Sequence, residues 1–250
     1  NSGENVEMDC ATCDVRIRTE WFDLGPRDIA CLNVAKERRS YATGETLYSA
    51  GDPCSGLSYV SAGLIRDCRQ PDRSAGAGVL TLRHPGDVLG LQSFLTGSAQ
   101  LTTATALQPS AVCFLSGQIV HALIARNPKA ILLFVRRLAG SLDCAEEKLA
   151  DQGADAICRR LVRLIGELRL AGAILGPKGE APLDVPLTAD ELAAAVGTSP
   201  RALGAVLRRL QAVGILSVRK DAVRILDLAR LQRAAHPAAQ TTAGLRRHDA

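Results

Sequence analysis

Two hydrophobic periodicities divide this chain of 250 residues into a strand-rich part and a helical part. Between Trp21 and Gln118, short runs of alternating apolar and polar residues are separated by turns that contain glycine and proline. Many short strands at this spacing predict an antiparallel β-barrel or jelly roll. After residue 126, apolar residues recur at every third or fourth position, which predicts helices.

One long helix is expected between residues 127 and 157. Its apolar residues are separated by alternating steps of four and three, which produces a narrow two-position seam. Such a seam suits a partner helix better than the broad face of a helix packed on its own barrel, which is the alternative. We therefore predict a homodimer through a seam formed by Ile131, Val135, Leu138, Leu142, Ala145 and Leu149.

A helix-turn-helix is predicted near the C-terminal end. Thr188 can cap the first helix, and Glu191, three residues later, completes a capping box. Gly197 can supply the turn because glycine accepts positive φ. Ser199 can cap the second helix, whose first position suits Pro200. In a helix-turn-helix protein, the second helix lies in the major groove of DNA.

A β-hairpin is predicted directly after the second helix. Two alternating runs between Ile215 and Leu226 flank a polar, basic tip at residues 219–221. A hairpin in this place is a wing, and its tip is expected to touch DNA phosphates. The pattern therefore predicts an α+β fold with five parts: an N-terminal cysteine segment (1–20), a β-barrel sensor domain (21–126), a dimerisation helix (127–157), a winged helix-turn-helix domain (158–236) and a flexible tail (237–250).

The distribution of charge supports a nucleic-acid partner. Residues 158–236 carry 13 Lys and Arg against 7 Asp and Glu, whereas residues 1–157 carry 15 against 18. The basic excess therefore lies in the segment expected to meet the phosphate backbone. The DNA contacts expected from the sequence are Thr188, Ser199, Pro200, Arg201, Gly204, Ala205, Arg208, Arg209 and Lys220.

Within this set, Arg201 is the side chain expected to read a guanine, because an arginine can fork onto that base. Gly204 and Ala205 offer only close approach or contact with a thymine methyl group. The other three basic residues are expected to contact phosphates.

Composition indicates a cytoplasmic chain. No run approaches about 18 uninterrupted apolar residues, so no membrane-spanning helix is expected. The stretch from Asn1 to Asp9 is polar and acidic, unlike a signal peptide. The eight cysteines are therefore expected to be buried thiols, metal ligands or redox sensors in a reducing compartment. No Ser-His-Asp set, paired carboxylates or phosphate loop stands out, so an enzyme is not expected.

Several stretches of the chain follow a known family pattern. They are Gly44-Glu45-Thr46-Leu47 with Gly51-Asp52, Tyr59-Val60-Ser61-Ala62-Gly63, His84-Pro85-Gly86-Asp87-Val88-Leu89-Gly90, and the run from Leu192 to Leu216. With the order of barrel, helix and winged domain, they resemble the CRP/FNR superfamily of bacterial transcription regulators over roughly residues 20–230. The resemblance implies a cyclic-nucleotide-binding-like barrel, a homodimer, a double-stranded DNA operator and contact with RNA polymerase.

The resemblance implies several signals, of which cyclic AMP is the first to consider. In the family, the phosphate of cyclic AMP sits on an Arg-Ser pair just before the last barrel strands. The corresponding stretch, from Ser98 to Thr105, contains no arginine. A buried phosphate without a cationic partner is poorly compensated. No cyclic AMP is expected.

The FNR-like branch, which the chain resembles most, implies an iron–sulfur cluster that senses oxygen, nitric oxide or redox state. Cys10 and Cys13 form a C-x-x-C pair, and Cys113 lies where the branch has its late cysteine. Thiolates at this spacing can bind one metal or cluster. The branch has a further cysteine where this chain has residues 19–21. Either Cys31 completes a [4Fe–4S] site, or an oxygen ligand does, or the site is incomplete.

A regulator of the same fold without metal is the alternative. It would sense thiol oxidation, or an unidentified small ligand in the barrel. Cys54 follows a proline in a turn and is expected to be exposed, and Cys68 lies near two arginines whose charges favour the reactive thiolate. A haem sensor of this fold would use a histidine such as His84 or His121. The simpler interpretation is a small, partly buried side chain for each of Cys54, Cys68, Cys144 and Cys158.

Overall fold

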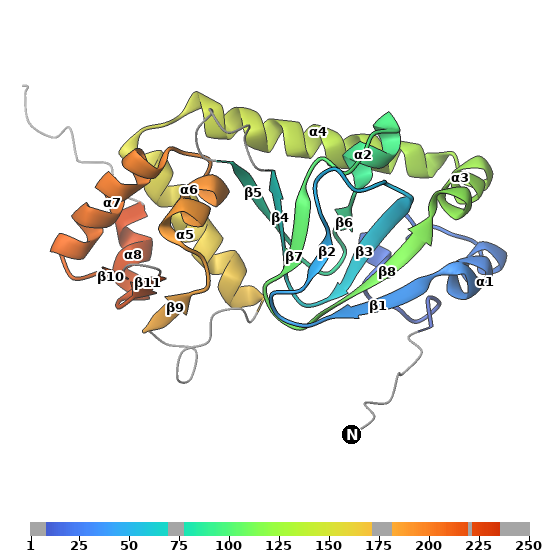
Figure 1. The fold of residues 1–250 in the computed structure, drawn as a ribbon, viewed down its shortest axis with the longest axis horizontal. Helices are drawn as coiled ribbons and strands as arrows, with labels where there is room; N and C mark the ends of the chain where they lie inside the picture. Colours follow the sequence, from blue (N-terminus) through green and yellow to red (C-terminus); the bar gives the residue numbers. More distant parts are fainter. Residues whose placement is uncertain (1–8, 70–77, 172–181, 220–221, 236–250) are drawn as a thin grey trace, which may run out of the picture. The chain divides into compact units, whose positions relative to one another are not determined.

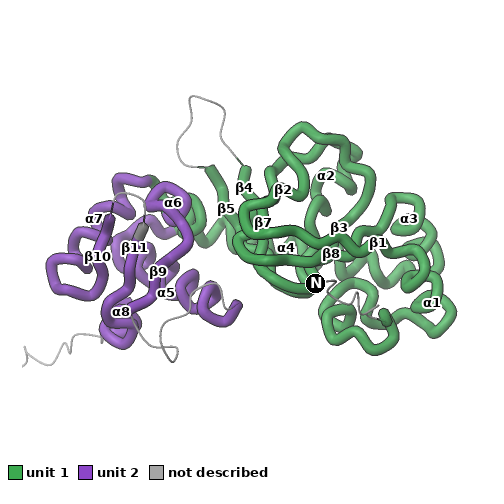
Figure 2. Tube along the Cα trace, turned by 60° about the horizontal axis from the view of Figure 1, so that its bottom comes forward, with its two compact units in different colours: residues 1–150, 193–199 green, residues 151–192, 200–250 purple. Residues whose placement is uncertain are grey.

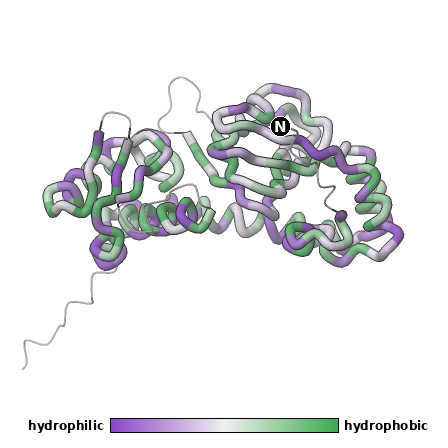
Figure 3. The backbone as a smooth tube through the Cα atoms, turned by 90° about the horizontal axis from the view of Figure 1, so that it is seen from below, coloured by the Kyte–Doolittle hydropathy of each residue, from purple (hydrophilic) through white to green (hydrophobic). Residues whose placement is uncertain are grey.

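The computed structural model describes residues 9–69, 78–171, 182–219 and 222–235 (Figure 1). The chain forms two units, residues 1–150 with 193–199 and residues 151–192 with 200–250 (Figure 2). In both units, hydropathy changes from residue to residue within individual helices and strands (Figure 3), as expected for elements that bury one face. Among the described residues, no helix has the length and apolar character needed to span a membrane.

The N-terminal unit begins with a short 3-10 helix, η1 (Arg16–Arg18), and the helix α1 (Pro26–Ala35). Its strands are β1 (Glu37–Tyr41), β2 (Thr46–Tyr48), β3 (Gly56–Ala62), β4 (Ile65–Arg69), β5 (Val79–Arg83), β6 (Val88–Leu89), β7 (Thr103–Ala106) and β8 (Ser110–Ser116). Its further helices are α2 (Leu91–Thr96), α3 (Gly117–Arg126) and α4 (Lys129–Ala150).

The strands form the jelly roll predicted from the alternating pattern. One sheet has the order β1-β8-β3-β6 and the other the order β2-β7-β4-β5, and neighbouring strands are antiparallel (Figure 1). The interior cluster is formed by Val60, Ile65, Leu89, Ala104 and Val112. Gly63 turns the chain between β3 and β4 with φ 88°, and a Cβ there would lie 2.6 Å from the carbonyl oxygen of Pro109. Only glycine fits this turn.

A second cluster covers the outer face of the β1-β8-β3-β6 sheet. Leu57 and Tyr59 of β3 contribute to it from the sheet, and the N-terminal segment, α1, α3 and α4 contribute from the other side. At its centre, Trp21 meets Tyr59 and Phe134 edge to face, with ring centroids 6.2 and 5.7 Å apart. At the outer face, the N-terminal segment, the sheet and α4 therefore share one hydrophobic core.

The long helix is shorter than the predicted 127–157. Helix α4 ends at Ala150, and a new helix, α5 (Ala154–Leu170), follows. Gly153 is extended at the start of α5, and its N–H donates to the Asp151 carboxylate at 2.9 Å. A glycine with a local side-chain acceptor favours a break over a continuous helix.

The packing of α4 on its own barrel is seen at one end of the helix, and the seam dimer stays a prediction. The helix buries Ala130 and Phe134 against its own barrel, and Leu138 packs partly on the same cluster. The remaining seam positions are exposed, with exposed fractions of 47% for Ile131, 54% for Val135, 59% for Leu142 and 79% for Leu149, and Ala145 is exposed too. An apolar stripe therefore stays uncovered on this helix.

The C-terminal part of the chain, from residue 154 onward, has the predicted winged helix-turn-helix order. After α5 come β9 (Leu183–Val185), α6 (Ala189–Val196), α7 (Pro200–Ala212), β10 (Leu216–Arg219), β11 (Ala222–Ile225) and α8 (Leu228–Ala235). The wing is a three-stranded sheet in the order β10-β11-β9. Strand β9 was not expected from the sequence. Because α5 begins at Ala154, the predicted domain start at residue 158 falls inside this helix.

The exposed stripe generates a prediction about assembly. Leu142→Glu places a charge in the seam, and an unpaired charge buried in a dimer costs several kcal/mol. We expect the dimer dissociation constant, measured by sedimentation equilibrium, to rise at least about tenfold. Leu138 is a poorer choice because it also packs on its own barrel.

The matched control for this experiment is Gly140→Glu. It adds the same charge to α4 at an exposed position where a Cβ would meet nothing within 4 Å. The control should leave the dimer intact. A Leu142→Glu protein as dimeric as the wild type would contradict a seam dimer.

Candidate functional site

The segment that carries Cys10 and Cys13 is folded into a loop by Arg16. The Nε of Arg16 donates to the carbonyl oxygen of Cys10 at 2.7 Å. Its Nη1 donates to the carbonyl oxygens of Trp21 and Phe22 at 2.8 and 2.9 Å. The guanidinium presents several donors in a fixed fork, so one side chain ties both ends of the segment together.

Cys113 faces this segment from the sheet. It lies on β8 opposite Arg38 of β1 and Tyr59 of β3. Because side chains alternate along a strand, Cys113 shares the outer face with Leu115, whereas Val112 points into the interior cluster. The outer face is the one that the N-terminal segment covers. The fold therefore brings Cys113 to the same side of the sheet as the C-x-x-C pair.

Lys36 and Asn33 hold Cys10 in place. The Nζ of Lys36 lies 3.3 Å from Cys10 Sγ and 2.6 Å from Asn33 Oδ1. The same amide oxygen accepts the backbone N–H of Cys10 at 3.0 Å. Burial is the largest influence and raises the pKa of Cys10, while the Lys36 ammonium acts in the opposite direction. Cys10 is therefore a protected thiol beside a cation.

Electrostatic coupling joins Cys113 to the same group. Burial raises the pKa of Cys113, Lys36 opposes the rise, and the negative charges of ionised Cys10 and Cys13 add to it. We call Cys10, Cys13 and Cys113 the three-cysteine site. The raised pKa values of Cys10 and Cys113 favour the protonated thiols. Each thiol must therefore lose its proton before it can bind a metal or react with an oxidant.

Cys31 does not join the three-cysteine site. Cys31 and Asn33 are two positions apart on α1, so their side chains point about 200° apart around the helix. Asn33 is directed at Cys10, whereas Cys31 acts on Arg126 of α3 and helps to raise the pKa of that guanidinium. Arg126 also pairs with Asp28 at 2.7 Å. The prediction that Cys31 completes the site therefore finds no support in the helix geometry.

The candidate oxygen ligands at the position of the family's further cysteine are partly engaged elsewhere, although Glu20 Oε2 is buried without a hydrogen-bond partner among the residues that the structure describes. The hydroxyl of Thr19 donates to the carbonyl oxygen of Arg16 at 2.7 Å, and Glu20 pairs with Arg137 at 2.6 Å. Within the described ranges, no group of three His, Cys, Asp or Glu side chains is arranged to hold a metal ion. The residues present do not fit a [4Fe–4S] cluster on four protein ligands.

The cysteines outside the three-cysteine site are buried or half-buried. Cys54 is not the exposed thiol expected from its turn: its Sγ contacts the carbonyl oxygens of two glycines at 3.6 and 3.8 Å, and burial raises its pKa. Burial also raises the pKa of Cys158 on α5. Cys68 on β4 and Cys144 on α4 are half-buried. The simpler interpretation of a packed thiol fits Cys54 and Cys158 best.

The barrel interior contains a buried ion pair. Asp67 shares a face of β4 with Ile65, a member of the interior cluster, and its side chain is 5% exposed. Arg83 of β5 donates to one carboxylate oxygen of Asp67 through Nε at 3.1 Å and Nη2 at 3.0 Å. Burial and the Asp67 charge together raise the pKa of Tyr48. A phosphate entering here would meet a carboxylate, with Arg83 already paired.

The capping box predicted for the first helix of the helix-turn-helix is present. The backbone N–H of Glu191 donates to Thr188 Oγ1 at 3.2 Å, and the Glu191 carboxylate accepts the backbone N–H of Thr188 at 2.9 Å. Gly197 adopts φ 74° at the turn, and Pro200 begins α7. The local signals in the sequence therefore specify this motif.

Helix α7 presents one polar face. Arg201, Ala205 and Arg208 are exposed at steps of four and three, so they share that face. Gly204 lies beside it, and a Cβ there would come within 3.4 Å of Arg208 Nη1. Thr188 and Ser199 are exposed at the two helix starts. The opposite face is buried by Leu203, Val206, Leu207 and Leu210.

The remaining expected DNA contacts have different outcomes. Arg209 turns toward α5, where its Nη2 lies 3.4 Å from Asp155 Oδ1. Lys220, at the wing tip, lies outside the described residues. Sequence reasoning missed β9, which pairs with β11 and is joined to it by Arg224 and Asp184 at 2.6 and 2.7 Å. The alternating Leu-Asp-Val of β9 is too short a signal to indicate a strand.

Comparison with known proteins gives the same two domains. Residues 38–127 match the cyclic nucleotide-binding domain, and residues 156–234 match the Crp-like helix-turn-helix domain. The chain is 23% identical to the transcriptional activator protein FnrL of Cereibacter sphaeroides, over 89% of this chain and 90% of that protein. It is 28% identical to the transcriptional regulator LdrP of Thermus thermophilus, over 79% and 96%.

Solved structures share the fold. The c-di-GMP responsive global regulator CLP of Xanthomonas campestris has a TM-score of 0.59 at 21% identity, over 81% of this chain and 99% of that one. FixK2 of Bradyrhizobium japonicum has a TM-score of 0.56 at 20% identity, over 82% and 99%.

A cyclic nucleotide-binding type barrel followed by a Crp-like helix-turn-helix defines a DNA-binding transcription regulator rather than an enzyme. The chain belongs to the CRP/FNR superfamily.

The exposed face of α7 generates a prediction about DNA recognition. Arg201→Ala should reduce the preference for an operator selected from random DNA by about 1–3 kcal/mol, because a base contact is lost. Arg208→Ala should weaken all DNA alike and reduce the salt dependence by about one phosphate contact. Fluorescence anisotropy at several salt concentrations measures both effects. Equal losses for Arg201→Ala on selected and random DNA would show that it does not read a base.

Proposed function

We propose that the protein is a dimeric, operator-binding transcription regulator whose DNA binding responds to redox state through the three-cysteine site. Two observations carry the proposal: Cys10 lies 3.3 Å from the Lys36 ammonium, and Cys113 lies on the face of the sheet that packs against α4, where the charges of Lys36, Cys10 and Cys13 act on its pKa. A change at these thiols would therefore alter the packing between this face of the sheet and α4, the helix that carries the exposed apolar stripe.

The names of relatives support a redox signal. The chain is 22% identical to an anaerobic regulatory protein of Pasteurella multocida, over 89% of this chain and 81% of that protein. It is 24% identical to the fumarate and nitrate reduction regulatory protein of Vibrio cholerae, over 89% and 88%. These names refer to anaerobic regulation and to fumarate and nitrate reduction, which agrees with a redox signal.

Metal-free thiol oxidation is the chemistry that we propose, because Lys36 lies beside one of the thiols and no fourth metal ligand is identified among the described residues. Two thiols that join as a disulfide release two protons and two electrons, which a peroxide accepts to form two molecules of water. Lys36 favours the thiolate needed for this step by lying 3.3 Å from Cys10 Sγ. The site needs no fourth ligand for this reaction.

An iron–sulfur cluster that responds to oxygen or nitric oxide is the second candidate. The C-x-x-C pair and Cys113 favour it, since they match the pattern of the FNR-like branch. Three thiols supply one ligand fewer than a [4Fe–4S] cluster takes from four cysteines. Loading of this site would therefore need a ligand other than Cys31.

The DNA-binding proposal follows from the C-terminal unit. Arg201 and Ala205 read base edges, Arg208 contacts a phosphate, and the wing tip at Lys220 contacts the backbone. Two copies joined through the α4 seam match a palindromic operator. Contact with RNA polymerase is expected from the family resemblance. Cyclic AMP is not the proposed signal, because Arg83 is paired with Asp67 inside the barrel.

Strictly anaerobic purification tests the redox proposal. We expect negligible iron and acid-labile sulfide, and we expect stoichiometric peroxide to remove two free thiols and change operator affinity at least fivefold. Cys113→Ser should abolish that change. Cys54→Ser, a half-buried cysteine outside the site, is the matched control and should respond as the wild type does.

Two results would overturn parts of this proposal. A brown protein that contains iron and sulfide, bleaches in air and is colourless in Cys13→Ser and Cys113→Ser would establish the cluster instead. Equal operator affinity for the reduced and oxidised wild type would remove redox control altogether.

A further inference from the structure

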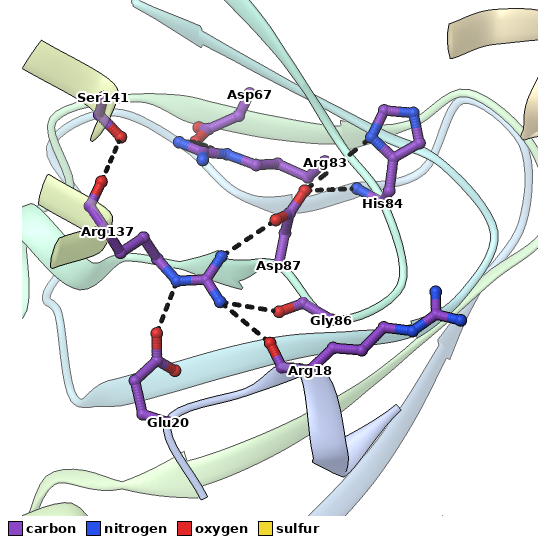
Figure 4. Close-up of polar contacts among 9 residues, drawn as sticks. All are labelled: Arg18, Glu20, Asp67, Arg83, His84, Gly86, Asp87, Arg137 and Ser141. Carbon is purple, nitrogen blue, oxygen red and sulfur yellow. Dashed lines mark hydrogen bonds and ion pairs between the residues drawn. The ribbon is translucent and has the colours of Figure 1, made fainter. Parts of the chain in front are cut away.

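Arg137 of α4 contacts two separate pieces of the N-terminal unit, the segment at residues 18–20 and the turn at residues 86–87 (Figure 4). Its Nε donates to Glu20 Oε1 at 2.6 Å, and its Nη1 donates to Asp87 Oδ1 at 3.1 Å. Its Nη2 donates to the carbonyl oxygens of Gly86 and Arg18 at 3.2 and 3.4 Å. All three guanidinium nitrogens are therefore bonded, two to carboxylates and one to backbone.

The Glu20 carboxylate depends on this arginine. The Glu20 side chain is 2% exposed, whereas that of Arg137 is 24% exposed. A buried carboxylate without a paired cation is strongly unfavourable. Burial opposes the charge on Arg137, but Glu20 and Asp87 outweigh burial and raise the pKa of the guanidinium. The arginine therefore stays charged.

The contacts of Arg137 have fixed directions. Asp87 follows the turn between β5 and β6, and its second oxygen accepts the backbone N–H of His84 at 2.9 Å. Gly86 in this turn has φ 99°, and a Cβ there would come within 3.0 Å of Arg18 Cβ. The turn and the N-terminal segment are thus in close contact beneath the guanidinium. A rotation of α4 would break several hydrogen bonds at once.

The same face of α4 makes the apolar contact with the segment. Phe134 lies one helical turn before Arg137, and it packs edge to face on Trp21, the residue after Glu20. Through Arg16, the backbone of Trp21 is tied to the backbone of Cys10. The connection from the three-cysteine site to α4 is therefore short and made of packed, hydrogen-bonded groups.

From this geometry we infer that Arg137 is the positioning residue that couples the three-cysteine site to the dimerisation face of α4. The inference rests on the proposed redox function and specifies how the signal travels. In the reduced protein, Arg137 and Phe134 hold α4 in one orientation on the N-terminal segment. When chemistry at the cysteines reshapes that segment, Glu20 moves, and the exposed stripe at Val135 and Leu142 moves with the helix.

The test measures the dimer dissociation constant of the reduced and the peroxide-oxidised protein, and the ratio of the two constants. Coupling between two sites is typically about 5- to 150-fold. We expect a wild-type ratio in this range and a ratio close to one for Arg137→Gln. Arg136→Gln removes the same charge from an exposed neighbour on α4 and should keep the wild-type ratio. Arg137→Lys, which keeps the charge but not the fork, should restore only part of it.

A second readout does not depend on the redox response. In the reduced protein, Arg137→Gln should loosen the segment and raise the alkylation rate of Cys113 at least about fivefold, while the rate at Cys144 stays unchanged. Glu20→Gln removes the charge and keeps the shape, so it should reproduce the effect if Arg137→Gln fails to fold.

The outcomes separate the two proposals. If the wild type has equal dimer dissociation constants in both redox states, the redox function is wrong, and so is the coupling that rests on it. Faster alkylation of Cys113 in Arg137→Gln would still show that Arg137 holds the N-terminal segment against α4. A responsive wild type whose ratio is unchanged in Arg137→Gln overturns the coupling, even if the melting temperature falls. If the alkylation rate of Cys113 is unchanged in both Arg137→Gln and Glu20→Gln, Arg137 does not hold the N-terminal segment against α4.

Discussion

The outer face of the β1-β8-β3-β6 sheet must be covered, and the rest of the N-terminal unit is arranged to do so. Its apolar side chains, among them Tyr59, would otherwise meet water. Trp21, which is 2% exposed, covers the centre of this face. Its ring also contacts Phe134 of α4. Removing a buried side chain of this size costs about 3–5 kcal/mol. The segment that carries the cysteines therefore cannot leave the sheet without breaking a shared core.

A polar interaction gives this core its direction. Apolar packing alone tolerates small rotations of a helix, because it is not directional. The fork of Arg137 is directional, and it ends on a carboxylate, Glu20, that has almost no access to water. A buried ion pair adds little net stability compared with apolar groups of equal volume. We therefore assign this pair to the orientation of α4, on which a seam with Leu142 at its surface depends.

The sequence predicted what local periodicity encodes. Alternating runs indicated the jelly roll, and the capping box of Thr188 and Glu191 located the first helix of the DNA-binding motif. The seam was found in the same way, but the end of α4 depends on a local bond at Gly153 that no periodicity reports. The Arg137–Glu20 pair joins positions 117 residues apart, and the sequence does not connect them. The role of Cys31 stays a prediction: the sequence shows that it lies two positions from Asn33 on α1, but the contact of Asn33 with Cys10 is tertiary and could not be foreseen.

Hydrogen exchange of the wild-type protein tests most directly whether the cysteines control α4. Backbone amides of residues 9–24 and 129–142 would be followed in the reduced protein and after oxidation by one equivalent of peroxide. If the segment and the helix form one mechanical unit, exchange should change in both regions together, by a similar factor. A change confined to residues 9–24, with α4 exchanging as before, would contradict the account.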